Sequence, residues 1–138
     1  MTIDWSSVKM KLALEGFYLF GGRRSDGTAS DELYVLEIGV SPLRWIKPVT
    51  SGPAPSARFD HTMERMRDYL VVMGGRSETR FLSSCYVLNL ERLMWVRIKL
   101  AGHEVIKRAE HSCALSRNLN KFFIFGGISE DHKFESNV

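Results

Sequence analysis

The sequence is poor in cysteine and proline, with two and four of these residues among 138. Cys85 and Cys113 stand 28 positions apart and form no CxxC pair, which excludes the usual cysteine-rich zinc modules and disulfide scaffolds. A disulfide between the two is one alternative. Two buried free thiols in a reducing compartment are the simpler one.

Long apolar runs are also missing, since no stretch approaches the roughly 18 residues that a membrane-spanning helix needs. Residues 1–7 lack the basic and then apolar pattern of a secretory signal. We therefore expect a cytoplasmic protein without a membrane partner. The net charge is only +3, and Lys and Arg are interleaved with acidic residues, so nucleic acid is not an expected partner.

Catalytic motifs are absent as well: the sequence has no GxSxG elbow, no phosphate-binding glycine loop leading into a helix, and no zinc-type histidine spacing. His61 and His111 each follow an acidic residue. Because neighbours in a strand point to opposite faces, neither acid–histidine pair is expected to form a catalytic couple. We predict no catalytic residue, no metal site and no cofactor.

What the sequence does contain is a repeat of about 50 residues. Three short apolar runs end in the glycine pairs Gly21-Gly22, Gly74-Gly75 and Gly126-Gly127, whose first members are 53 and then 52 residues apart. Other landmarks keep a similar spacing, namely Tyr34 and Tyr86, Trp45 and Trp95, and Arg58–His61 and Arg108–His111. Landmarks that recur in one order indicate tandem structural units.

The segments inside one unit have the character of strands, because they are short, rich in Val, Ile, Leu, Phe and Tyr, and bounded by Gly, Pro, Ser and Asp. In the middle unit we predict strands at about 59–65, 69–73, 85–90 and 94–99. No segment has sustained helical periodicity. Four antiparallel strands in about 50 residues predict the blade of a β-propeller.

An apolar strand that ends in Gly-Gly, followed by a Tyr and then a Trp, resembles the kelch repeat. The resemblance implies an all-β fold of kelch-type β-propeller blades, each of four antiparallel strands. We place repeat one at about 8–50, repeat two at about 56–100, a truncated repeat three at about 106–128 and a polar tail at 129–138. Repeat one lacks the arginine and histidine that open the others, and its first strand is expected at about Val8–Leu14.

The number of repeats is too small to close a ring. Propellers have about four to eight blades, and this chain supplies fewer than three. Uncovered sheet faces and edges associate with other surfaces. We therefore expect further propeller blades, from the same or another chain, among the partners. The alternative is that the blades stack as an open array.

Most of the landmarks are expected to be structural. A second glycine with a positive φ suits the end of each strand, large aromatic rings fill the space between blades, and a repeated histidine is expected to be packed and hydrogen-bonded. The residues assigned this role are Gly21, Gly22, Gly74, Gly75, Gly126, Gly127, Tyr34, Tyr86, Trp45, Trp95, His61 and His111.

The resemblance also implies where partners dock, on the face formed by the loops after the glycine pairs and the loops that enter each first strand. Guanidinium groups grip carboxylates through two hydrogen bonds, so arginines in these loops are the candidates. They are Arg23, Arg24, Arg58, Arg76, Arg80 and Arg108. For Arg58 and Arg108 the alternative is that they tie loops together by binding backbone carbonyls.

The predicted function is a non-catalytic protein–protein interaction module, or a scaffold component of a larger assembly such as a cytoskeletal complex. An alternative is the substrate-recognition propeller of a ubiquitin-ligase adaptor or of a kelch-containing phosphatase. A remote alternative is a copper enzyme similar to galactose oxidase, whose chemistry needs Cys, Tyr and His on the propeller axis.

Overall fold

The computed structural model of the protein describes residues 16–99, 106–116 and 121–131. These residues form eleven strands and no helix, and therefore no helix with the length and apolar character that crossing a membrane requires. The strands are β1 Gly16–Phe20, β2 Leu33–Glu37, β3 Arg44–Ile46, β4 Thr62–Met66, β5 Tyr69–Met73, β6 Cys85–Asn89, β7 Met94–Ile98, β8 Arg108–Ala109, β9 Ser112–Ser116, β10 Lys121–Phe125 and β11 Ile128–Ser129.

The middle unit is a complete blade. Its four strands pair antiparallel in the order β4-β5-β6-β7, which confirms the predicted blade architecture. The strand β5 occupies the predicted positions, and β6 and β7 each end one residue earlier than expected. We call this sheet blade 2.

The first strand of blade 2 begins later than predicted. Asp60 adopts a φ of 56°, in the left-handed region, and β4 starts only at Thr62. Glu110, the equivalent residue of the next unit, has a φ of 58° and precedes β9 in the same way. Each acid therefore lies in a bend before its strand, and it was wrong to place Asp60 in the strand.

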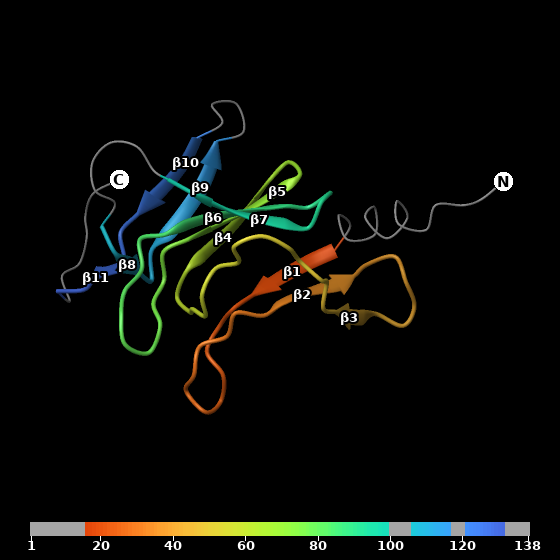
Figure 1. The fold of residues 1–138 in the computed structure, drawn as a ribbon, viewed down its shortest axis with the longest axis horizontal. Helices are drawn as coiled ribbons and strands as arrows, with labels where there is room; N and C mark the ends of the chain where they lie inside the picture. Colours follow the sequence, from red (N-terminus) through yellow and green to blue (C-terminus); the bar gives the residue numbers. More distant parts are fainter. Residues whose placement is uncertain (1–15, 100–105, 117–120, 132–138) are drawn as a thin grey trace.

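The outer units are represented by parts of blades. Blade 1 contains β1, β2 and β3 in that order, and its expected first strand at about Val8–Leu14 lies outside the described residues. Blade 3 contains the pair β9–β10, beside which β8 and β11 form a separate two-stranded ladder. Figure 1 shows blade 2 lying between the other two.

The core consists of the contacts between blades. One apolar cluster joins blade 1 to blade 2 through Phe20, Leu33 and, across the gap, Trp95, whose ring lies 5.4 Å from that of Phe20. A second joins Val71 and Met73 of blade 2 to the β10 strand of blade 3. The strand β5 is therefore apolar on both faces, because both faces are covered.

The outward faces of blades 1 and 3 are uncovered within the described part of the chain. Trp95 is 1% exposed, whereas Trp45, the equivalent residue of blade 1, is 54% exposed. Trp45, expected to fill the space between blades, is therefore not covered by a second blade among the described residues. Trp95 faces blade 1, and the register pairs Leu88 with Trp95 and Leu36 with Trp45, so Trp45 faces the side where a preceding blade would lie.

The two repeated tyrosines differ in the same way. Tyr86 is half-buried and packs against the cluster between blades 1 and 2. Tyr34 lies on the outward face of blade 1, where its hydroxyl donates to Glu32 over 3.3 Å and Lys47 lies 5.9 Å from its ring centre. Only Tyr86 is therefore placed between two described blades.

Candidate functional site

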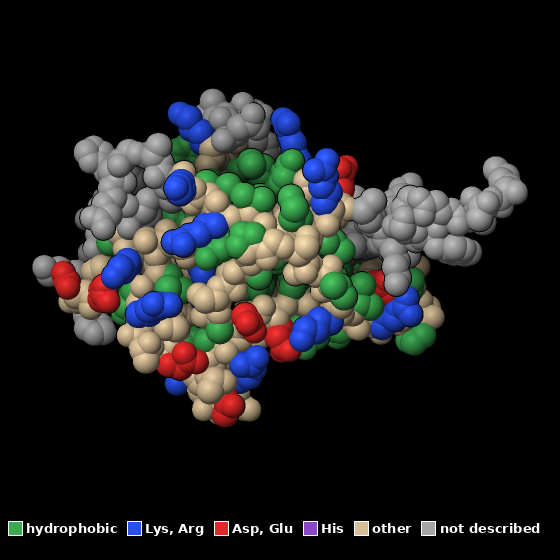
Figure 2. All heavy atoms as spheres, viewed as in Figure 1, with side chains coloured by type: hydrophobic (Ala, Val, Ile, Leu, Met, Phe, Trp, Pro, Cys, Tyr) green, Lys and Arg blue, Asp and Glu red, His purple; other side chains and the backbone are tan. Residues whose placement is uncertain are grey.

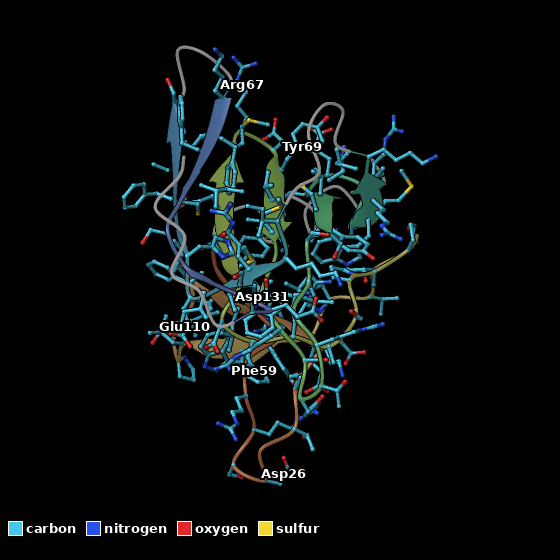
Figure 3. All side chains as sticks on the ribbon, turned by 90° about the vertical axis from the view of Figure 1, so that its left-hand side faces the viewer. Asp26, Phe59, Arg67, Tyr69, Glu110 and Asp131 are labelled. Carbon is cyan, nitrogen blue, oxygen red and sulfur yellow. The ribbon has the colours of Figure 1, made fainter. Side chains whose placement is uncertain are left out.

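The blades have two ends, and the loops gather at one of them. In Figure 3, Phe59, Glu110 and Asp131 lie at this end, and Asp26 marks a loop that projects beyond it. Arg67 lies in the tight turn between β4 and β5 at the opposite end. We call the end formed by residues 21–32, 56–61, 74–84 and 106–111 the loop face.

A repeated hydrogen-bond pattern holds the loop face together. The Gly22 amide donates to the Arg58 carbonyl at 2.8 Å, and the Gly75 amide donates to the Arg108 carbonyl at 2.9 Å. Both members of each glycine pair have positive φ, including 62° at Gly74 and 87° at Gly75. The glycine pair of one blade thus binds the segment that enters the next blade.

Arg58, one of the arginines expected to contact a partner, is fully buried. Its Nη1 donates to the Gly74 carbonyl at 2.9 Å and its Nε to the Ser56 carbonyl at 3.1 Å. The alternative of a loop-tying arginine therefore describes its contacts. Arg108 is half-buried and likewise donates through Nη1 to the Gly126 carbonyl at 3.1 Å.

Arg76 lies at the centre of a cluster on the loop face. Its Nε is 2.8 Å from Asp60, and its Nη2 is 3.2 Å from Glu110. Its guanidinium lies 5.2 Å from the ring centre of Phe59 and 5.8 Å from that of Phe81. One arginine therefore joins blades 2 and 3 and leaves a planar face available for stacking.

Arg23, the equivalent of Arg76 in blade 1, contributes to the same cluster. Its guanidinium lies 5.6 Å from the Phe59 ring centre. Arg24 points elsewhere, donating to the Ala29 carbonyl at 2.8 Å and lying 3.7 Å from Glu32. Arg23 is thus at the cluster, whereas Arg24 stabilises its own loop.

A hollow of about 440 Å³ opens beside these side chains. We call it the Phe59 hollow. Its lining includes Arg23, Phe59, Arg76, Glu78, Arg80 and Phe81. Glu78 accepts a hydrogen bond from the Ala29 amide, which ties the loop of blade 2 to that of blade 1. The hollow therefore combines cationic side chains and aromatic rings on loops that are fixed to each other.

Comparison with known proteins identifies the repeat. The family model described as the KLHDC2/KLHL20/DRC7 Kelch-repeats domain matches residues 5–137. The chain belongs to the kelch-repeat family. Human Host cell factor 1 is 31% identical over 126 residues, which cover 80% of this chain and 6% of that protein. Acyl-CoA-binding domain-containing protein 4 of Arabidopsis thaliana is 34% identical over 151 residues, covering 99% of this chain and 22% of that protein.

The kelch chain thus spans less than a quarter of the length of these curated relatives. A solved structure, titled "Structure of YjhT", superposes with a TM-score of 0.64 at 20% sequence identity, covering 86% of this chain and 33% of that one. This likeness shows the fold alone. The all-β, propeller-blade architecture inferred from the sequence is confirmed.

The two repeated kelch histidines are the last residues of two loop-face segments. His61 is half-buried, and burial, with the nearby Arg58 charge, lowers its pKa to about 4. His111 is buried, its Nε2 lies 2.9 Å from the Thr62 hydroxyl, and burial lowers its pKa as well. Both histidines are therefore neutral near pH 7, and neither side chain is exposed.

The cysteines of the kelch chain are free thiols. Cys85 is buried and Cys113 half-buried, and burial raises the pKa of each. Both are therefore protonated near pH 7, unlike a nucleophilic cysteine. Within the described ranges, His, Cys, Asp and Glu form no group of three or more that could hold a metal ion.

The rings of Phe59 and Phe81 were not anticipated as site residues. Phe59 directly follows the loop-tying Arg58, at a position where the next repeat has Ala109. Phe81 belongs to the one apolar pair, Phe81-Leu82, in the otherwise polar stretch 76–84. Both departures from the pattern of their surroundings were visible signals, because an unexplained aromatic residue in a surface loop indicates binding.

Proposed function

We propose that this kelch chain is a non-catalytic interaction module that binds a partner protein at the Phe59 hollow. A kelch-repeat domain is consistent with a protein-interaction module. The observation that carries the proposal is the stack of Arg23, Phe59, Arg76 and Phe81 on the loop face. Arginine and aromatic side chains are the types that dominate binding energy at protein interfaces.

The stack is also held in place before any partner arrives. Arg76 is fixed by two carboxylates, Phe59 is buried, and Glu78 links the loops of adjacent blades. A binding site whose side chains are already ordered loses little conformational entropy on association. The same fixation explains why Arg76 acts through its planar face, since its hydrogen-bonding edge is occupied by Asp60 and Glu110.

Arg80 is the side chain in the hollow best suited to grip a carboxylate. It is exposed, and within the described residues its guanidinium has no acidic partner. We therefore assign direct partner contact to Arg23 and Arg80, and a positioning role to Arg76. Arg58, Arg108 and Arg24 maintain the loops.

The partners include further propeller blades. Phe17 is 66% exposed and Phe125 is 57% exposed on the two outward faces. The equivalent residues of blade 2, Leu70 and Met73, are buried by the neighbouring blades. Free thiols at Cys85 and Cys113 support a reducing compartment, and we place the module in the cytoplasm.

The experiment is affinity capture from cell extract with the unaltered chain and with an Arg23→Gln/Arg76→Gln variant, since these two arginines line the Phe59 hollow. An Arg67→Gln variant, altered at the opposite end of the blades, is the control. Proteins that bind the unaltered chain and Arg67→Gln but not the double variant support docking at the Phe59 hollow. Retention of every captured protein by the double variant contradicts it.

A further inference from the structure

A second hollow on the loop face lies next to the Phe59 hollow and has a different chemistry. It has a volume of about 400 Å³ and lies against Tyr86 on β6 and Arg97 on β7. We call it the Tyr86 hollow. It shares Arg80 and Phe81 with the Phe59 hollow, and its other polar lining residues are Ser56, Ser83, Ser84, Arg97 and Lys107.

The lining of the Tyr86 hollow is cationic. Its charged residues are Arg80, Arg97 and Lys107, and no carboxylate lines it among the residues that the structure describes. Lys107 is paired with Glu130 at 2.9 Å, but no ion pair involves Arg80 or Arg97 within the described ranges. Figure 2 shows Lys and Arg side chains spread over one face of the molecule among hydrophobic ones, with Asp and Glu between some of them.

A third arginine, Arg58, lies behind the wall of this hollow. Arg58 is fully buried and has no carboxylate partner among the described residues. Its guanidinium lies 5.3 Å from the Tyr86 ring centre, and that of Arg97 lies 6.0 Å from the same ring centre. Buried charges in proteins are usually neutralised by a partner charge, whereas Arg97, on the same Tyr86 ring, has the same sign as Arg58.

The serine hydroxyls of the hollow are available as hydrogen-bond donors to a ligand. Arg58 Nη2 donates to Ser84 Oγ at 3.2 Å and to Ser56 Oγ at 3.4 Å. A hydroxyl oxygen that accepts from a guanidinium retains its own proton for donation. Ser56 and Ser84 therefore line the hollow as donors, beside the guanidinium groups of Arg80 and Arg97, which have no acceptor atoms.

We propose that the Tyr86 hollow binds a phosphorylated serine or threonine side chain of a partner peptide. The site offers donors and positive charge without a compensating acid, so it favours a ligand that supplies acceptors and negative charge. A phosphate carries about −1.5 to −2 charges and three acceptor oxygens. It therefore balances Arg58, Arg80 and Arg97 more completely than one carboxylate. The ligand class rests on this hollow alone and does not require docking at the Phe59 hollow.

The test is a titration of the purified chain with capped phosphoserine, followed through the backbone amide NMR signals of Ser83 and Ser84. Capped glutamate and capped serine are the comparison ligands. Arg97→Gln is the test variant, because Arg97 is exposed and lines only the Tyr86 hollow of the two. Arg92→Gln removes the same charge from the exposed turn after β6 and is the matched control.

We expect saturable shifts with capped phosphoserine, tighter binding than with capped glutamate, and no shifts with capped serine. Arg97→Gln should weaken the phosphoserine affinity about tenfold, since it removes a hydrogen bond to a charged group. Arg92→Gln should change it by less than about twofold. Absence of saturable binding, equal affinity for glutamate, or equal effects of the two variants would overturn the proposal. If affinity capture finds no partner at the Phe59 hollow, the proposed function fails. The phosphoserine titration still tests the Tyr86 hollow on its own.

Discussion

Individual glycines of the repeated pairs differ in how much room surrounds them. A Cβ added at Gly75 would lie 2.6 Å from His61 Cβ and 2.8 Å from the Phe59 carbonyl oxygen, whereas at Gly22 nothing lies within 4 Å. Both residues have positive φ, 87° and 98°. The two positions therefore share backbone strain on substitution but not steric overlap.

We expect Gly22→Ala to lower the free energy of unfolding by about 1–2 kcal/mol, the cost of a side chain in the left-handed region. Gly75→Ala adds overpacking and should lower it by about 3–5 kcal/mol. Urea unfolding followed by circular dichroism measures both values. Equal losses in the two variants would show that the contacts around Gly75 relax without cost.

The buried Arg58 should be a stability residue. Arg58→Ala removes two hydrogen bonds to backbone carbonyls, leaves the Gly74 carbonyl without its guanidinium donor and opens a void, so we expect a loss of about 3 kcal/mol in the free energy of unfolding. Arg80→Ala, an exposed change in the neighbouring loop, should cost less than about 0.5 kcal/mol. Urea unfolding of both variants decides this, and a small effect at Arg58 would contradict a loop-tying role.

His61 should make stability depend on pH. An unfolded histidine titrates near pH 6.5, whereas folded His61 has a pKa of about 4, so the unfolded chain binds more protons between these values. The contribution of His61 is therefore complete above about pH 6.5 and is lost as the pH falls toward 4. Urea unfolding at a series of pH values should show a shallower decline for His61→Gln. If the free energy of unfolding of His61→Gln falls as steeply with pH as that of the unaltered chain, other groups, such as His111, cause the fall.

At the scale of the elements, how much a strand contributes to stability depends on whether a second blade covers it. The strands β3 and β7 are the outer strands of blades 1 and 2, and each carries a tryptophan at the equivalent position. Trp95 on β7 packs against Phe20 of blade 1. Trp45 on β3 lies on the outward face of blade 1, which no described residue covers.

We therefore expect Trp95→Ala to lower the free energy of unfolding by about 3–5 kcal/mol, enough to unfold blade 2 in a marginally stable chain. Trp45→Ala should cost less than about 1 kcal/mol in the monomeric chain, where its face is uncovered. Urea unfolding followed by far-ultraviolet circular dichroism measures the free energy of unfolding of both variants. A large loss at Trp45 would mean that its outward face is covered in solution.

For the whole molecule, the uncovered faces of blades 1 and 3 are expected to control association. Leu19 and Phe125 lie on these two faces, and both are more than half exposed. Apolar sheet faces of this kind associate with other apolar surfaces in water. We therefore expect the isolated chain to form oligomers or aggregates rather than a stable monomer.

Light scattering alongside analytical ultracentrifugation measures the molar mass of the chain. A Leu19→Lys/Phe125→Lys variant should shift the distribution toward monomer. Val49→Lys should not, because Val49 is 91% exposed but lies in a loop away from the sheet faces. A monomeric unaltered chain would contradict the role assigned to these faces.

The sequence by itself determined the repeat, the strands and the blade architecture. Glycine pairs, tyrosines and tryptophans at a constant spacing are local signals, because strand formation and the ends of strands depend on nearby residues. The loop-tying alternative for Arg58 and Arg108 was also visible, since both recur at one repeat position. Phe59 and Phe81 departed from the surrounding pattern and were overlooked.

Only the tertiary structure decided what each equivalent residue does. Trp45 and Trp95 occupy the same repeat position, yet one is exposed and the other buried, because burial depends on the presence of a neighbouring blade. Arg58 and Arg80 are chemically identical, yet one is buried in contact with Gly74 and the other is exposed beside the two hollows. Burial, charge pairing and the convergence of loops from different blades arise from contacts between residues distant in sequence, which a local pattern does not encode.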